Sequence, residues 1–148
     1  MSLDLKDQYD RILRYCFYKV HNRDVAEDIC QETFLRFLEH PQYHGIGKDL
    51  QYLYTIAGNL CADHYRKTPS EELTDTFPDD ADHEEDVLTG VALSDAIRKL
   101  PEEDSELILL RYKNEVPVSV LSKLYGVSRF AMDRRIKKIL SVLKKDFE

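Results

Sequence analysis

Three groups of polar side chains in this sequence have types and spacings that suit charged partners. Acids and amides recur at helical spacing between residues 24 and 32, amides and tyrosines gather between 43 and 66, and seven bases face one acid between 129 and 145. An acidic face suits a basic protein, and a basic face suits nucleic-acid phosphates. In the group between residues 43 and 66, aromatic rings lie beside amides and basic side chains, a combination that suits stacking on unpaired nucleotides.

The acids and the histidines do not have the arrangement of an active site. The carboxylate pairs Asp24/Asp28 and Glu27/Asp28 would lie on a solvated helix face, where no burial raises the carboxyl pKa for acid catalysis. His40 and His44 have helical spacing, but a proline between them disfavours the shared helix that a metal site would need. We therefore expect no catalytic residue, no metal and no cofactor, and an enzyme is the weakest alternative.

Composition indicates a water-soluble chain without a membrane span. Of its 148 residues, 43% are hydrophobic and 33% are charged. No apolar run approaches the roughly 20 residues that cross a bilayer, and the acidic start is not a signal peptide, so we expect no membrane insertion and a cytoplasmic location. Cys16, Cys30 and Cys61 lack the paired spacing of zinc ligands and are expected to be small buried hydrophobes.

Apolar residues recur at helical spacing throughout, so the fold class expected is all-α. Asp24, with Glu27 three residues on, is expected to cap the second helix, and Pro101 suits the first turn of a later one. Leu38 and Leu140 are expected to be buried with the other apolar residues of their helices. We expect helices over residues 5–20, 24–38, 50–66, 87–100, 101–112, 117–124 and 128–143.

The segment from Glu71 to Asp86 separates two helical modules. It holds nine acids and no Lys or Arg, so it cannot bury enough apolar surface to repay the entropy of ordering. Without those nine, the 28 acids fall to 19 against 21 bases, and the net charge of -7 becomes +2. We expect an N-terminal helical domain over residues 1–68, a flexible acidic linker over 69–86 and a C-terminal domain over 87–148.

Residues 117–138 have the order of a helix-turn-helix. A short apolar helix precedes Gly126, where a left-handed turn is needed, and Ser128 can cap the basic helix that follows. Such a second helix fits the major groove of duplex DNA. With its apolar residues facing inward, the last helix is expected to leave these bases facing outward: Arg129, Arg134, Lys137 and Lys138.

The third helix leaves two interpretations open. Its polar side offers Asn59, Asp63, Arg66 and Lys67. The aromatic residues nearby are Tyr52, Tyr54 and Tyr65. These rings either stack against unpaired bases or belong to the half-buried core.

Together these stretches resemble bacterial RNA polymerase sigma factors of the extracytoplasmic-function (ECF) group. The resemblance rests on residues 24–38, on residues 52–66 and on the chain from Leu100 through the helix-turn-helix, and it covers nearly everything outside the acidic linker. It implies a chain that keeps the second and fourth sigma domains. Such proteins bind core RNA polymerase, direct it to promoter DNA, and are commonly held by an anti-sigma factor.

The resemblance also implies a role for each group of residues. The acidic helix would bind the clamp helices of core polymerase through Asp24, Glu27, Asp28, Gln31 and Glu32. The third helix and the loop before it would contact the minus-ten element through Tyr43, His44, Lys48, Tyr52, Asn59, Asp63 and Arg66. Within that set, Asn59 and the loop would hold a base flipped from the stack. The last helix would contact the minus-thirty-five element through Ser128, Arg129, Arg134, Arg135, Lys137 and Lys138.

The chain differs from the family at positions that bear on promoter sequence. Asp49 and Tyr52 stand where the family usually has an aromatic residue and Trp, and Ser122 stands where it often has Ala. Residues 130–132 (Phe-Ala-Met) replace the usual Gly-Thr-Val, and Asp133 follows where a base is frequent. We therefore transfer no promoter consensus. The main alternative is a stand-alone helix-turn-helix regulator, which would leave the acidic helix unexplained.

Overall fold

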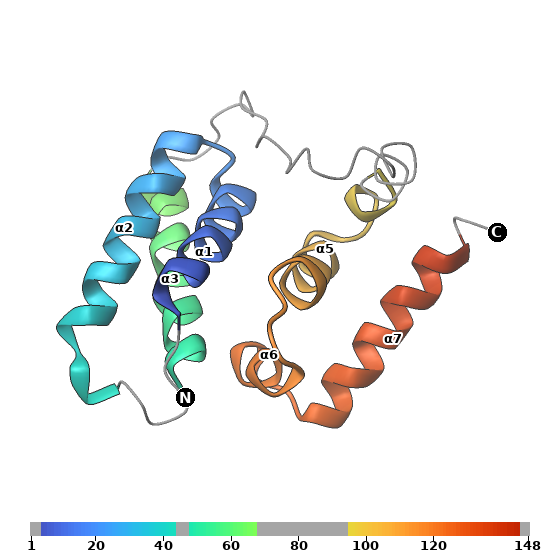
Figure 1. Ribbon diagram of the computed structural model, residues 1–148. Helices are drawn as coiled ribbons and strands as arrows, with labels where there is room; N and C mark the ends of the chain where they lie inside the picture. Colours follow the sequence, from blue (N-terminus) through green and yellow to red (C-terminus); the bar gives the residue numbers. More distant parts are fainter. Residues whose placement is uncertain (1–3, 44–47, 68–94, 146–148) are drawn as a thin grey trace. The chain divides into compact units, whose positions relative to one another are not determined.

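A computed structural model describes residues 4–43, 48–67 and 95–145, and its elements are all helical (Figure 1). The N-terminal elements are α1 (Leu5–Val20), α2 (Arg23–Glu39), the short 3-10 turn η1 (Pro41–Tyr43) and α3 (Asp49–Lys67). The C-terminal elements are α5 (Glu102–Ile108), the π-helical segment η3 (Leu109–Lys113), α6 (Val118–Tyr125) and α7 (Arg129–Lys145). These ranges contain no strand, and the all-α prediction is confirmed.

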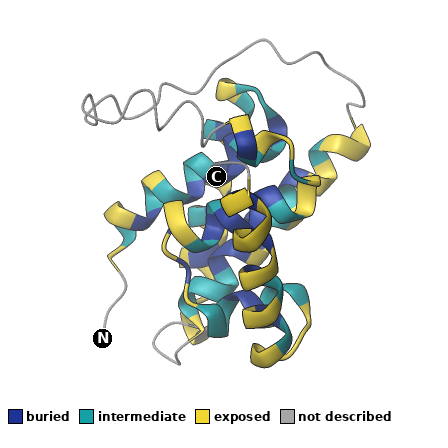
Figure 2. Cartoon of the chain, turned by 90° about the vertical axis from the view of Figure 1, so that its right-hand side faces the viewer, coloured by how far each residue is buried: buried dark blue, intermediate teal, exposed yellow. Residues whose placement is uncertain are grey.

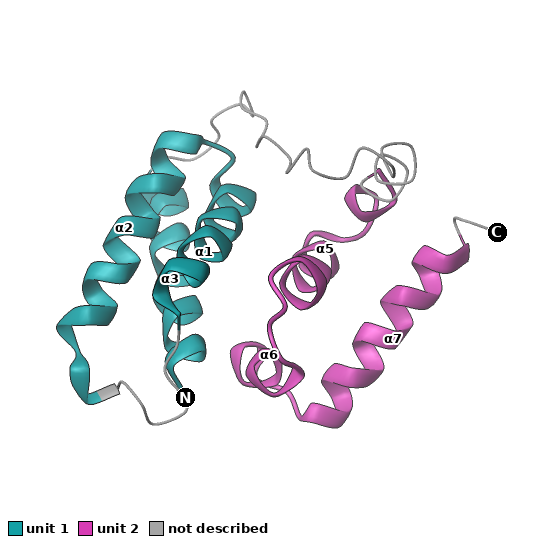
Figure 3. Ribbon diagram, in the orientation of Figure 1, with its two compact units in different colours: residues 1–77 teal, residues 78–148 magenta. Residues whose placement is uncertain are grey.

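The chain divides into two compact units, residues 1–77 and 78–148 (Figure 3). The limits predicted for the acidic linker lie outside the described residues, as does most of the helix predicted over 87–100. Of that helix, residues 95–100 are described and residues 95–98 are helical. No helix in the described part of the chain is long and apolar enough to cross a membrane.

Helix boundaries in the first unit follow from local capping. Asp4 accepts a hydrogen bond from the first turn of α1 (3.3 Å), and His21 ends this helix in the left-handed conformation (φ 54°). Asn22 is extended (φ -141°), and its side chain accepts from the backbone N–H of Val25 (3.1 Å). The prediction that Asp24 caps α2 is therefore wrong. Asp24 is the second residue of α2 and lies in its first turn, where a negative charge interacts favourably with the helix dipole.

The three helices of the first unit pack against one another, each contacting the other two. Their fully buried side chains are Ile12, Cys16, Ala26, Cys30, Thr33, Leu53, Ala57 and Cys61. Gly58 allows one close approach, because a Cβ there would lie 3.3 Å from the hydroxyl oxygen of Tyr15. The Tyr15 ring meets Tyr54 edge-on, with centroids 5.4 Å apart. Small residues on α3 thus let α1 approach closely.

All three cysteines are free thiols in this core, as their apolar neighbours predicted. A hydrogen bond with Cys61, together with burial, raises the pKa of the Cys16 thiol well above its ordinary value. Burial also raises the pKa of Cys30 to about 12, and its thiol donates to the carbonyl oxygen of Tyr9 (3.6 Å). Thiols with raised pKa values stay protonated, so Cys16 and Cys30 act as small packing groups.

The second unit is built around α7, which contacts both α5 and α6. Its most deeply buried apolar side chains are Leu107, Leu110, Val116, Leu121 and Met132. The backbone N–H of Asn114 donates to the carbonyl of Leu109 (3.0 Å), five residues back, which is the hydrogen bond of a π-helix. Pro101 has an extended ψ of 147° and immediately precedes α5, so it lies one position earlier than the first turn predicted for it.

Two leucines predicted to be buried are exposed. Leu38 of α2 is 53% exposed and Leu140 of α7 is 37% exposed. Each directly follows a residue that the core does bury, Phe37 or Ile139, and one step along a helix turns the side chain by about 100°. In each unit, buried residues line the faces where helices meet and exposed ones face outward (Figure 2).

Candidate protein and nucleic-acid interfaces

The predicted acidic residues of α2 lie at the surface of the first unit. Glu27 is half-buried, and the exposed members of the group are Asp24, Asp28, Gln31 and Glu32. Glu27 accepts from Arg23 (3.4 Å) and Glu32 from Arg36 (2.9 Å), both along the helix. Exposed pairs of this spacing contribute roughly 0.3–0.5 kcal/mol, so a partner can displace them at little cost.

The same face of α2 has an apolar half that sequence reasoning missed. Leu35 is 56% exposed and Leu38 is 53% exposed. The steps from Asp24 through Asp28, Gln31 and Leu35 to Leu38 are four, three, four and three residues, which keep all five on one helix face. We call these five residues the α2 outer stripe. It offers carboxylates and an amide at one end and two leucines at the other, a combination that suits a partner with basic and apolar side chains.

One face of α3 gathers four of the residues predicted to contact unpaired DNA. Tyr52, Asn59, Asp63 and Arg66 follow at steps of seven, four and three residues. Asn59 is exposed, and Asp63 and Arg66 form an exposed ion pair of 3.0 Å. Tyr52 is half-buried, and its ring centroid lies 5.9 Å from that of Phe37. The face therefore presents a free-standing amide between an anchored ring and a charged pair.

The two other tyrosines of α3 have structural positions. Tyr54 is 2% exposed and packs against Tyr15 in the core, so it cannot stack on a nucleotide. The hydroxyl of Tyr65 donates to the backbone carbonyl of Lys19, which ties the end of α3 to α1. Of the two interpretations left open by the sequence, the core interpretation holds for Tyr54.

The loop before α3 is only partly described. Tyr43 belongs to η1, Lys48 is exposed before the first turn of α3, and His44 lies outside the described residues. His40 ends α2 as its C-cap and Pro41 begins η1, so the two elements are not one helix. Within residues 4–43, 48–67 and 95–145, no group of three or more His, Cys, Asp or Glu side chains could hold a metal ion.

The turn between α6 and α7 has the chemistry that the sequence predicted. Gly126 is left-handed (φ 68°), and the N–H of Val127 returns to the carbonyl of Ser122 (2.9 Å). The hydroxyl of Ser128 accepts from the N–H of Ala131 (3.0 Å), which caps α7. Both the Gly126 and the Ser128 predictions are confirmed, and they fix the direction in which α7 leaves the turn.

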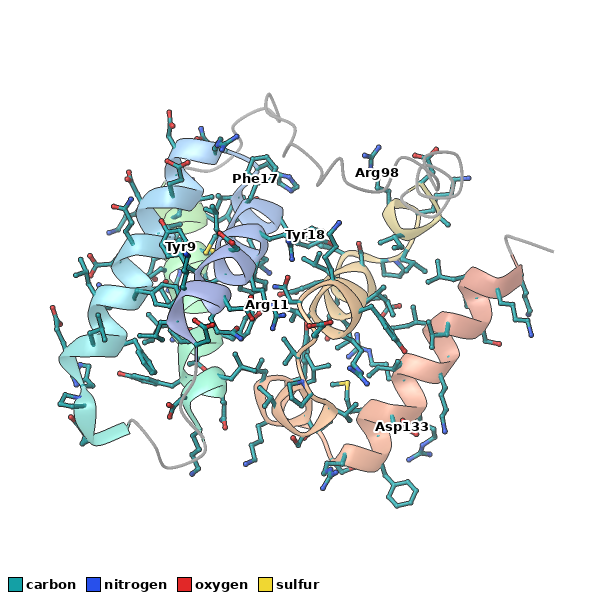
Figure 4. The ribbon with its side chains drawn as sticks, viewed as in Figure 1. Tyr9, Arg11, Phe17, Tyr18, Arg98 and Asp133 are labelled. Carbon is teal, nitrogen blue, oxygen red and sulfur yellow. The ribbon has the colours of Figure 1, made fainter. Side chains whose placement is uncertain are left out.

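The outward side of α7 is basic. Its core side is formed by Met132, Ile136, Ile139 and Leu143. Arg129, Arg134 and Lys138 are exposed. Lys137 is exposed too and pairs with Asp133 (3.0 Å), which lies near the N-terminal end of the helix (Figure 4). The Asp133 carboxylate partly neutralises the charge of Lys137, in the part of the helix where contacts with DNA bases would be made.

Arg135 differs from the other bases because it joins elements of its own unit. Its guanidinium contacts Glu103 (2.9 Å) and Asp104 (3.0 Å) of α5 and lies 5.8 Å from the ring centroid of Tyr125 on α6. Partial burial lowers the pKa of Arg135, but the hydrogen bonds to Asp104 and Glu103 outweigh it and the pKa is raised. The positive charge of Arg135 is therefore already compensated by Glu103 and Asp104, which weakens any attraction between Arg135 and a DNA phosphate.

Known proteins resemble the chain in sequence and in fold. Residues 5–70 match the family model for Sigma-70 region 2. Over 140 residues the chain is 33% identical to the ECF RNA polymerase sigma factor BldN of Streptomyces coelicolor, covering 86% of this chain and 53% of BldN, or about half its length. It is 27% identical over 161 residues to the ECF RNA polymerase sigma factor SigW of Bacillus subtilis, covering 96% of this chain and 86% of SigW.

A solved structure, the sigma factor RpoE in complex with the anti-sigma factor NepR from Bartonella quintana, resembles the chain with a TM-score of 0.62. It covers 94% of this chain and 91% of that one at 16% identity, which is a likeness of fold. The first unit therefore carries the region 2 match, and the second carries the helix-turn-helix. Residues 5–70 thus carry the Sigma-70 region 2 match, and the chain as a whole is similar in sequence to RNA polymerase sigma factors of the ECF group.

Proposed function

We propose that the protein binds core RNA polymerase and directs promoter recognition, strand opening and transcription initiation. The observation that carries this proposal is the presence, in one chain, of a region 2 unit bearing the α2 outer stripe and a complete helix-turn-helix. A stand-alone DNA-binding regulator would need only the second unit. It would have no use for exposed leucines aligned with carboxylates on α2.

In this proposal the α2 outer stripe binds core polymerase. Asp24, Asp28 and Gln31 meet basic and polar groups of the clamp helices, with Glu27 and Glu32 beside them, while Leu35 and Leu38 bury apolar surface. Fully burying a leucine side chain contributes roughly 1.5–3 kcal/mol. The carboxylates add steering and orientation more than affinity.

The two units contact the two promoter elements. The α3 face and the loop from Tyr43 to Lys48 bind the minus-ten element, with Asn59 holding a flipped base. The outward side of α7 binds the minus-thirty-five element, through Arg134, Lys137 and Lys138, with Ser128 and Arg129 beside them. Arg135 is assigned chiefly to packing within its unit. Because the units are linked, the first contact raises the effective concentration of the second.

The proposed function includes inhibition by a protein partner. It requires no catalytic residue and no cofactor in this chain. The likeness of fold to RpoE, a protein solved in complex with the anti-sigma factor NepR, supports an anti-sigma partner. A transcription initiation factor needs no catalytic residue or cofactor of its own, because polymerase supplies both. Working with core RNA polymerase places the protein in the cytoplasm.

Charge reversal on the α2 outer stripe tests the polymerase contact. Asp28→Lys is expected to lower affinity for core RNA polymerase by roughly tenfold or more, because a like charge replaces a complementary one at the docking face. Asp10→Lys is the matched control, since Asp10 is also an exposed acid but belongs to α1. Affinity is measured by pull-down and by titration of labelled protein with core enzyme. No binding by the wild-type chain would contradict the proposed function, and equal loss in both variants would contradict the assigned face.

A further inference from the structure

Phe130 is unusual among the apolar residues of the chain. Its side chain is 84% exposed, more than any other large hydrophobic residue in the described part of the molecule. It lies in the first turn of α7, two residues after the capping Ser128. The cap stabilises this turn, and the turn holds the ring at the surface. Within residues 95–145, the described part of the second unit, the packing does not bury this ring.

The ring lies on the side of α7 that faces away from the core. At about 100° per residue, Phe130 points roughly 150° away from the mean direction of the four buried residues of α7. Arg134 and Lys137 follow it at i+4 and i+7, so the three side chains share one outward stripe. Phe130 is the member nearest the N-terminus, which is the part of a recognition helix that reaches base edges.

We infer that Phe130 is a specificity-determining residue that contacts the 5-methyl group of a thymine in the upstream promoter element. Apart from the polar edges of the bases, the major groove offers that methyl group, and an aromatic side chain is one of its usual partners. Arg134 and Lys137 on the same stripe draw the helix to the phosphates and base edges around it. This inference rests on the proposed function, because it assumes that α7 lies in the major groove of a promoter.

The contact selects thymine by the burial of one methyl group. Removing a buried methyl(ene) group costs the equivalent of a roughly fourfold change in binding. Neither cytosine nor uracil offers the methyl, so both are disfavoured there to at least that extent. Phe130 thus adds an apolar contact at the N-terminal end of α7, where Ser128 and Arg129 alone would contact only polar groups of the DNA.

Replacing single thymines by deoxyuridine tests the inference, because the change removes only the methyl group. Templates with one dT→dU change at each position of the upstream element are transcribed by polymerase carrying the wild-type chain, Phe130→Ala or Val142→Ala. Val142 is the control, being 45% exposed on the same helix but three turns from Phe130. At one thymine, the dT→dU change is expected to lower transcription by wild type and by Val142→Ala roughly fourfold when the protein is subsaturating. Transcription by Phe130→Ala is expected to be roughly fourfold lower than that of wild type on the dT template already, and not to fall further on the dU template.

Each other outcome overturns the inference. If Phe130→Ala remains as sensitive as wild type to the same methyl, a different side chain contacts it. If no single dU change affects the wild type, Phe130 does not read thymine, and if Phe130→Ala also transcribes every template normally, the exposed ring serves a protein partner. These results leave the proposed function intact. Failure of the wild-type chain to direct initiation at any promoter would overturn the proposed function, and the inference with it.

Discussion

At the scale of single residues, Asn59 is the clearest candidate for a contact with an unpaired base. Its amide is exposed on α3, one turn before the Asp63–Arg66 ion pair. An amide both donates and accepts hydrogen bonds, so it can match the edge of a base that has left its pairing partner. Such contacts offset the few kcal/mol that flipping costs.

Asn59→Ala is therefore expected to slow strand opening by roughly tenfold, the equivalent of one net hydrogen bond. Binding to closed, double-stranded promoter should change less than about twofold, because the base is then still paired. Permanganate reactivity of unpaired thymines measures opening, and gel shift at low temperature measures closed-complex binding. Thr55→Ala is the control, since Thr55 is exposed one turn earlier and its hydroxyl is occupied by the carbonyl of Gln51. Normal opening by Asn59→Ala would contradict base capture.

The burial of individual residues was also where prediction from the sequence failed. Leu38 continues the apolar pattern of α2, and nothing in the sequence distinguishes it from the adjacent Phe37, which the core buries. The distinction depends on which side of α2 packs against α1 and α3, which is a tertiary property. The spacing of Leu38 from Asp28 and Gln31 was visible in the sequence, but only its exposure makes this face a candidate for docking.

At the scale of elements, local chemistry was predictable and pairing across the sequence was not. Gly126 and Ser128 act on their own neighbours, so turn and cap could be predicted from residue type. The α2 cap was missed by two residues because Asn22 and Asp24 are both good capping residues. Arg135 meets Asp104 across 31 positions. Only the packing of α5 against α7 brings them together, so Arg135 could not be separated from the DNA-facing bases.

Arg134 and Arg135 should consequently behave differently when replaced. Arg135→Ala is expected to destabilise the second unit by about 1–2 kcal/mol, because it leaves Asp104 and Glu103 without their shared cation. Arg134→Ala should change stability by less than about 0.5 kcal/mol and instead weaken promoter binding. It should also flatten the salt dependence of that binding by about one phosphate contact. Urea unfolding and binding at several salt concentrations give both quantities. Equal stability of the two variants would contradict the structural role of Arg135.

At the scale of the whole molecule, the two units carry different surfaces. The first presents the α2 outer stripe and the α3 face, and the second presents the basic side of α7 with Phe130. The whole chain carries a net charge of -7, so overall electrostatics oppose its approach to DNA. The all-α class and the helix-turn-helix followed from the sequence pattern. In the proposed function, docking on core polymerase compensates for this unfavourable charge by holding both units beside promoter DNA.

Transcription in vitro with core RNA polymerase, genomic DNA and the purified full chain measures whether the chain directs initiation. New, discrete start sites are expected only when both the chain and core enzyme are present, each preceded by two sequence elements at a constant spacing. In the absence of core enzyme, the chain should bind the same DNA weakly. Tight, sequence-specific binding of the chain alone, with no new start sites when core enzyme is present, would contradict the account and identify a stand-alone regulator.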